Sequence, residues 1–211
     1  GLGDVYKRQA YKFSSEGFDI VIGGTNLERL RNVQSNIIKI GSKCEYIVHD
    51  ISVNNDVKKM IDLTIKCFGR IDVLICNAGI SYRSIFEHVN IDVFEKLFKI
   101  NFFGSVYSVK HSIPYLIKSK GSIIAISSLN GFIATPTRSA YVSSKHAIQG
   151  FFDSLRLELK TKDVHVMVAS PGYFSSNFRK NTLKSDGNKE GESSRDEKGM
   201  ITSEDVANRI Y

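Results

Sequence analysis

The chain has 211 residues, of which 42% are hydrophobic and 24% charged, with a formal net charge of +7, three cysteines, three prolines and no tryptophan. This length fits one α/β domain, the apolar content excludes a disordered chain, and no stretch approaches the about 18 consecutive apolar residues of a transmembrane helix. The basic residues are scattered, which argues against a nucleic-acid-binding arm, and three cysteines without metal-ligand spacing argue against a disulfide scaffold and fit a reducing compartment (Cys44, Cys67 and Cys76).

The first segment, residues 1–9, back-translates to a DNA string that resembles a transposon-end adapter used in sequencing libraries. We therefore expect these residues to be foreign, and we derive the fold from Ala10 onward. The alternative is that Gly1 and Gly3 end a phosphate-binding glycine loop.

Five short apolar runs, rich in β-branched residues, are predicted to be strands. Their nearly continuous hydrophobicity is typical of strands covered on both faces, as in a parallel sheet. In chain order the runs are Phe18–Gly24, Cys44–Val48, Ile71–Cys76, Ser122–Ser127 and Val164–Ser170.

Helical stretches separate these strands: Asn26–Ile40, Val53–Phe68, Asn90–Lys118 and Ser139–Lys160. Gly41, Gly69 and Gly121 stand where helix C-caps are expected. Pro114 is expected to kink or interrupt the third helical stretch. Repeated βα units with short connections predict a doubly wound parallel sheet within one α/β domain, residues 10–211.

Residues 180–199 differ in composition, because half of them are charged and almost none is apolar. We expect a mobile surface loop, which is either a disordered insertion or a substrate lid. Thr202 then opens a helix with acidic residues behind it, and the chain stops at Tyr211 inside that helix, so we expect truncation at this end as well.

Four features carry chemistry. Tyr141 and Lys145 are four residues apart on one face of a predicted helix, a spacing that is weak evidence by itself. Ser128 follows the fourth predicted strand, and Asn77-Ala78-Gly79 follows the third. Asn101 interrupts a helical stretch. Taken singly, Ser128 is an ordinary strand-end hydroxyl and Asn101 a helix-break cap.

In this order the features resemble the short-chain dehydrogenase/reductase family, and Pro171-Gly172 after the last strand completes the pattern. Residues 139–156 and 170–173 are most similar to the member-seven-B branch of its dehydrogenase/reductase group. The resemblance implies a Rossmann-like, three-layer α/β/α fold. It also implies catalytic roles for Tyr141 as general acid/base, Ser128 as a donor to the substrate oxygen, Lys145 as the cation that lowers the phenol pKa, and Asn101 as the holder of a water.

The resemblance also implies a nicotinamide cofactor, bound at the carboxyl ends of the strands. The cofactor-binding residues it indicates are Thr25, Asp50, Ile51, Asn77, Ala78, Gly79, Tyr141, Lys145, Pro171, Gly172, Phe174 and Ser176. Asp50 can also be a turn residue or a cap. The segment Gly23-Gly24-Thr25-Asn26 lacks the acid that selects NAD, and Arg29 is one turn further on, so NADP is favoured over NAD.

The family register places the last loop glycine where Tyr6 stands, and not at Gly3. We therefore expect the first strand and the glycine loop to be missing. In that family the first strand lies in the middle of the sheet, between the second and the fourth. The chain as written is expected to misfold or to bind cofactor poorly, because unpaired strand edges and apolar side chains would be exposed.

The function expected from the resemblance is hydride transfer between NAD(P) and a small-molecule carbonyl or alcohol. Apolar side chains on loops favour a steroid, retinoid or lipid-like substrate (Phe86, Phe132, Ile133, Tyr173 and Phe178). A non-catalytic nucleotide-binding or scaffold protein and an epimerase or dehydratase are the alternatives. Homodimers or homotetramers are expected through residues 139–160. The default location is cytoplasmic, whereas an anchor before residue 10 would place the protein at the endoplasmic reticulum membrane.

Overall fold

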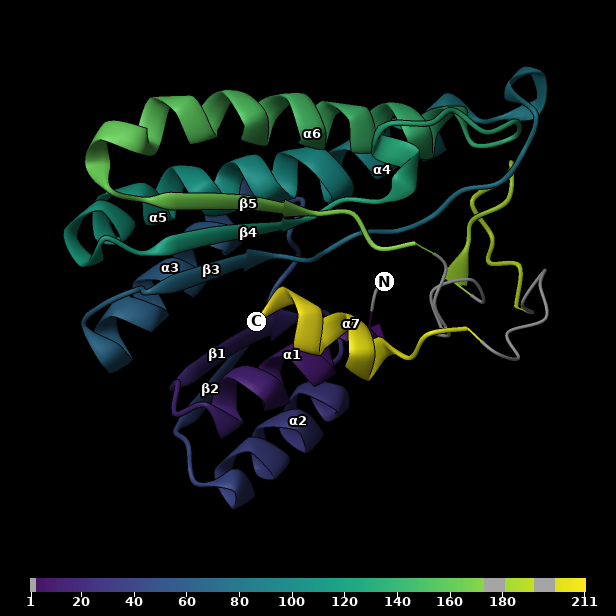
Figure 1. Ribbon diagram of the computed structural model, residues 1–211. Helices are drawn as coiled ribbons and strands as arrows, with labels where there is room; N and C mark the ends of the chain where they lie inside the picture. Colours follow the sequence, from purple (N-terminus) through teal and green to yellow (C-terminus); the bar gives the residue numbers. More distant parts are fainter. Residues whose placement is uncertain (1–2, 173–180, 192–199) are drawn as a thin grey trace.

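The computed structural model describes residues 3–172, 181–191 and 200–211. Its strands form two parallel sheets (Figure 1). One sheet pairs β1 (Ile20–Gly24) with β2 (Cys44–Val48). The other has the order β3–β4–β5, from β3 (Val73–Cys76), β4 (Ser122–Ile126) and β5 (His165–Ala169). Each of the five predicted runs contains a strand.

Helices cover both faces of these sheets. They are α1 (Gly3–Ser15), α2 (Leu27–Ile40), α3 (Asn54–Phe68), α4 (Ile91–Phe98), α5 (Gly104–Ser119), α6 (Ser139–Leu159) and α7 (Ser203–Ile210). Helices α3, α5 and α6 bury the main core against one face of the β3–β5 sheet, whereas α1 and α7 pack on the other face (Figure 1). Helices α1 and α2 pack on the β1–β2 sheet. The three-layer α/β/α arrangement is therefore confirmed.

The helix ends follow local chemistry. The Asn26 side chain accepts a hydrogen bond from the Arg29 amide and caps α2. Gly41 and Gly69 end α2 and α3 in the left-handed conformation, with φ of 105° and 74°, as predicted. The prediction for Gly121 was wrong, because Lys120 is the left-handed C-cap of α5, with φ of 53°.

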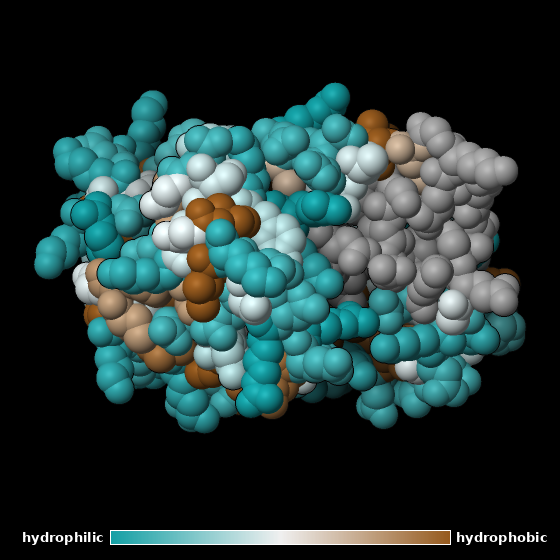
Figure 2. Space-filling model, turned by 90° about the horizontal axis from the view of Figure 1, so that it is seen from below, coloured by the Kyte–Doolittle hydropathy of each residue, from teal (hydrophilic) through white to brown (hydrophobic). Residues whose placement is uncertain are grey.

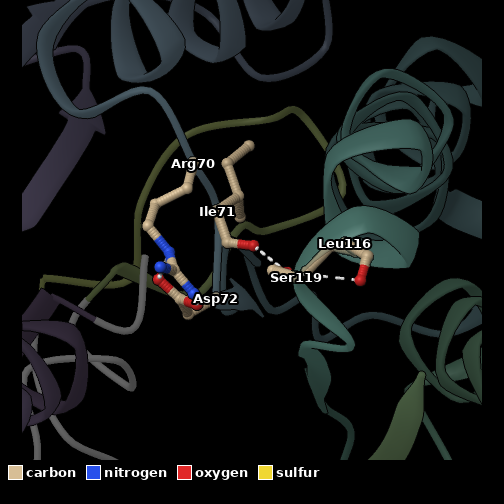
Figure 3. A network of polar contacts seen from close by, with 5 residues as sticks. All are labelled: Arg70, Ile71, Asp72, Leu116 and Ser119. Atoms are coloured by element: carbon tan, nitrogen blue, oxygen red, sulfur yellow. Dashed lines mark hydrogen bonds and ion pairs between the residues drawn. The ribbon is translucent and has the colours of Figure 1, made fainter. Parts of the chain in front are cut away.

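Gly121 is instead required by close packing. A Cβ atom there would lie 2.4 Å from the Asp72 carbonyl oxygen, which accepts a hydrogen bond from the Ser122 amide. Figure 3 shows the neighbouring contacts: the Ser119 hydroxyl donates to the Ile71 carbonyl at 2.6 Å, and Arg70 pairs with Asp72. These bonds fix the end of α5 to the start of β3.

The third helical stretch is interrupted at Asn101 and not at Pro114. A π-helical turn, η2 (Lys99–Phe103), separates α4 from α5, whereas α5 continues through Pro114. The expected interruption at Pro114 was therefore wrong. Pro114 lies on the exposed side of the helix, where water can satisfy the carbonyl that loses its amide donor.

Residues 3–9 form the first half of α1, which runs without a break into residues 10–15. Gln9 is 2% exposed and Ala10 packs in the core beside α2. Residues 3–9 thus belong to a helix that packs on the β1–β2 sheet, and the foreign origin of residues 1–9 stays a prediction.

The two sheets are separate in the described part of the chain, where β1 pairs with β2 and β3 pairs with β4. A cavity of about 1190 Å³ lies between them, and its walls include β1, β3 and the inner side of α1. This is the position at which the family resemblance placed a further strand.

Residues 181–191 lie against the loop that follows β3. Leu183 is 6% exposed and bridges to Tyr82. The expected mobility of residues 180–199 stays a prediction. Within that range, residue 180 and residues 192–199 lie outside the described residues. In the described ranges, no helix is long and apolar enough to cross a membrane. The lower face of the molecule is mostly hydrophilic, with its apolar side chains in separate small patches (Figure 2).

Candidate active site

Tyr141 and Lys145 lie on the first turns of α6 and are both buried, with 6% and 1% of their surface exposed. The Lys145 Nζ atom lies 5.9 Å from the centroid of the Tyr141 ring. The helical spacing thus places the phenol and the ammonium side by side, as the sequence predicted.

Ser128 follows β4 and caps the short helix η3 (Leu129–Gly131), where its hydroxyl accepts a hydrogen bond from the Asn130 amide at 3.2 Å. The same hydroxyl also acts on the Tyr141 phenol as a donor that lowers the pKa of the phenol. A carbonyl oxygen placed between these two hydroxyl groups would meet one donor from each, which is the geometry for stabilising charge on that oxygen.

Burial dominates the electrostatics of this pair. It raises the pKa of Tyr141 above its ordinary value, while the hydrogen bond from Ser128 and the charge of Arg138 act in the opposite direction. Burial also lowers the pKa of Lys145 to about 8, and its ammonium donates to the Ile126 carbonyl at 2.8 Å. In this structure the ammonium is directed at a backbone carbonyl, and the lowering of the phenol pKa by Lys145 stays a prediction.

Asn101 is 1% exposed and sits in the π-helical turn. Its side chain accepts from the Ile80 amide at 2.8 Å and donates to the Ile80 carbonyl and to the Ser144 hydroxyl, both at 3.0 Å. These bonds connect the loop after β3 to α6, the helix that carries Tyr141 and Lys145. The water that Asn101 is expected to hold stays a prediction.

A second group of predicted residues lines the cavity between the sheets: Thr25, Asp50, Ile51, Asn77, Ala78 and Gly79. The Asn77 Oδ1 atom is buried without a hydrogen-bond partner in the described structure, so it is free to accept from a bound ligand. Asp50 accepts from the Ser52 amide and hydroxyl, at 2.9 and 2.7 Å, and thus also forms a turn.

Gly79 lies where the two groups meet. A Cβ atom on it would be 3.5 Å from Asn101 Oδ1 and 3.7 Å from Lys145 Nζ. The predicted catalytic residues thus adjoin the predicted nucleotide-binding loop, although Tyr141 and Lys145 are not among the cavity-lining residues.

Other predicted residues lie at the margin of the site. Pro171 and Gly172 follow β5, and a Cβ atom on Gly172 would lie 3.7 Å from the Leu129 side chain. Phe174 and Ser176 lie outside the described residues, as do Tyr173 and Phe178. Phe86, Phe132 and Ile133, predicted to face a substrate, are 60%, 59% and 61% exposed.

Sequence reasoning missed Arg138 and Ser81. The Arg138 Nη1 atom donates to the Ser81 hydroxyl at 2.8 Å, immediately before the helix that carries Tyr141. The sequence does show a cation three residues before Tyr141. It does not show that this cation bonds to Ser81, because the two residues are distant along the chain.

Comparison with known proteins gives a consistent result. The profile of the short chain dehydrogenase family matches residues 1–187. The protein "Dehydrogenase/reductase SDR family member 7B" of Rattus norvegicus is 38% identical over 199 residues, which cover 90% of this chain and 60% of the rat protein. The protein "11-beta-hydroxysteroid dehydrogenase 1A" of Arabidopsis thaliana is 35% identical over 178 residues, covering 83% of this chain and 50% of the plant protein. The chain thus spans 50–60% of the length of these relatives.

Among solved structures, an alcohol dehydrogenase from the archaeon Thermococcus sibiricus, complexed with 5-hydroxy-NADP, superimposes with a TM-score of 0.87. The match covers 98% of this chain and 83% of the archaeal one, at 20% sequence identity. This likeness supports the fold.

Proposed function

The chain belongs to the short-chain dehydrogenase family, and from that premise we propose that it performs NAD(P)-dependent oxidation and reduction of an alcohol/carbonyl pair. The observation that carries the proposal is the buried Tyr141 phenol with the buried Lys145 ammonium 5.9 Å from its ring, next to Ser128, whose hydroxyl acts on the phenol. A donor pair of this kind suits a reaction in which negative charge develops on a carbonyl oxygen.

A bound nicotinamide would supply or accept the hydride at the substrate carbon. In the reducing direction, the substrate oxygen takes the Tyr141 proton, and the phenol becomes a phenolate. Ser128 donates a hydrogen bond to the same oxygen while its charge develops. In the oxidising direction, the phenolate accepts the proton from the alcohol.

The residues present fit such a cofactor on the adenosine side. The unpartnered, buried Asn77 Oδ1 offers an acceptor, and Ala78 and Gly79 allow close approach of the backbone. The end of β1 supports a preference for NADP, because Thr25 stands where an acid would repel a 2′-phosphate and the exposed Arg29 follows on α2. The archaeal neighbour carries an NADP derivative, which agrees with this proposal.

The proposed substrate class is an apolar ketone or alcohol, such as a steroid, retinoid or lipid. Three exposed apolar side chains flank the catalytic residues in sequence (Phe86, Phe132 and Ile133). The name of the plant relative gives a steroid as the substrate of that protein.

The test is turnover by the protein as its gene encodes it, with a panel of ketones and with NADPH or NADH as donor. We expect consumption of NADPH that falls about 10²- to 10⁴-fold in Tyr141→Phe, because the phenol proton is lost. Tyr107→Phe, on α5 against Phe103, is the matched control and should retain activity. A Tyr141→Phe protein with unchanged turnover would disprove the proposal. Nucleotide binding without any turnover would favour the scaffold alternative.

A further inference from the structure

Arg138 occupies the position directly before α6 and serves as its N-terminal flanking residue. Residues three apart lie on the same side of a helical turn, so Arg138 and Tyr141 are neighbours at the start of this helix. The arginine is half-buried, whereas Tyr141 is buried.

Two bonds hold this segment to the loop that follows β3. The Arg138 Nη1 atom donates to the hydroxyl of Ser81, which is 1% exposed. On the adjacent residue, the Thr137 carbonyl accepts from the Ser84 amide at 2.9 Å. Thr137 has a φ of 64°, a conformation that costs energy for a β-branched residue and persists where surrounding contacts enforce it. The position of Arg138 is therefore fixed from two sides.

The groups packed around Tyr141 are mostly apolar, so a second cation beside Lys145 can influence the charge of its phenol. The ammonium of Lys145 is bound to the Ile126 carbonyl. Helix α4 contributes Val93 and Leu97, and the remaining neighbours in this cluster are apolar except for Tyr82, whose hydroxyl donates to the Ser84 carbonyl. The Arg138 charge also acts to lower the Tyr141 pKa.

We propose that Arg138 is a positioning residue of the reaction proposed above. Anchored on Ser81, it holds a positive charge beside the Tyr141 phenol and sets the pH range over which this phenol exchanges its proton with the substrate. The inference rests on the proposed function, since it assigns the electrostatic support of the same proton donor. Arg138 lies outside the sequence motif that contains Tyr141 and Lys145.

The sign of the effect follows from the charge. A cation stabilises the phenolate, so its removal moves deprotonation to higher pH. In the oxidising direction, the rate rises with pH as the phenolate forms, and this rise moves to higher pH. In the reducing direction, the fall in rate at alkaline pH moves to higher pH as well.

The experiment compares pH profiles of kcat/KM for the wild-type protein, Arg138→Gln and Arg138→Lys. Glutamine keeps an amide donor for Ser81 and removes the charge, whereas lysine keeps the charge. We expect the profile of Arg138→Gln to move to higher pH and that of Arg138→Lys to stay near the wild type. Arg138→Met is a second neutral variant, and its pH profile is measured if the glutamine variant does not fold.

Arg156→Met is the matched control. Arg156 lies on the same helix, about 22 Å from Tyr141 at the rise of an α-helix, and pairs with exposed Asp153. At this distance its charge is screened, so the variant should leave the profile in place. A shift of equal size in Arg156→Met would contradict a local effect of Arg138.

A second readout is independent of turnover. The difference between the ultraviolet titrations of a protein and of its Tyr141→Phe form isolates the phenol of Tyr141. This difference titration should move to higher pH in Arg138→Gln, even if no substrate is turned over, so that failure of the proposed function and failure of this inference are separate results. Superimposable pH profiles or titrations, or a loss of rate that is equal at every pH, would overturn the inference.

Discussion

The β3–β5 sheet and the β1–β2 sheet are built from the same parallel βα units, yet they are enclosed to different degrees. Strand β4 has partners on both sides, and the large core of α3, α5 and α6 covers its sheet. Among the strands that the structure describes, β1 has one partner, and it borders the cavity. The residues proposed to donate protons lie beside the first sheet, whereas Thr25, which is proposed to select the nucleotide, follows a strand of the second.

From this difference we expect the residues proposed for proton transfer to be held by a more stable part of the fold than the residue proposed to select the cofactor. Ser128 and Tyr141 are held by a packed core, because β4 and α6 both contribute to it. Thr25 follows the open strand and is exposed. Changes in the β1–β2 sheet should therefore affect binding of nucleotide more than the geometry of proton transfer.

The largest effect on stability is expected from Phe152→Ala. Phe152 on α6 is fully buried in the larger core, and removal of such a ring costs about 3–5 kcal/mol. Leu30→Ala, in the core of α2 and β1, should cost less, because the smaller cluster borders the cavity and can relax. Denaturant unfolding of both variants measures the difference. An equal or greater loss for Leu30→Ala would contradict the ranking of the two sheets.

A smaller effect is expected from Gly23→Ala in β1. The added Cβ would lie 2.2 Å from the ring of buried His49 and 2.8 Å from Met60 Sδ, so the side chains must move, at a cost of about 1–3 kcal/mol. Gly150→Ala on α6 is the control, because it has nothing within 4 Å and should be neutral or stabilise the helix by about 0.5–1 kcal/mol. Thermal unfolding distinguishes them, and a Gly23→Ala protein as stable as the control would show that β1 is free to shift.

The smallest effect concerns pH. Burial lowers the pKa of His49, against the smaller opposing effects of the Ile47 backbone and of the Asp56 and Asp50 charges. Both ring nitrogens are buried, and neither makes a hydrogen bond of ordinary geometry in the described structure. As the pH falls below about 6.5, the unfolded chain binds a proton that the folded protein resists, so the fold loses stability until the folded pKa is reached. His49→Gln should reduce this loss between about pH 7 and pH 5. The same pH dependence of unfolding in both proteins would contradict the role of His49.

Much of the fold followed from the sequence, because apolar runs and capping residues act locally. Asn26, Gly41 and Gly69 ended their helices as predicted. Gly121 was misassigned, because its need for a small side chain comes from Asp72 in a distant strand connection. The spacing of Tyr141 and Lys145 was enough to propose α6 as the catalytic helix. Burial, which raises the phenol pKa, and the bond from Arg138 to Ser81 depend instead on tertiary packing.

The central claim is that proton transfer and nucleotide selection are separable. The most direct measurement determines kcat and the nucleotide Kd together for Tyr141→Phe and Thr25→Asp. We predict that Tyr141→Phe loses turnover about 10²- to 10⁴-fold at unchanged Kd. Thr25→Asp should weaken NADPH about tenfold, by repulsion of the 2′-phosphate, at nearly unchanged kcat. A Tyr141→Phe protein that keeps its kcat, or a Thr25→Asp protein that binds NADPH as before and loses kcat instead, would contradict the account.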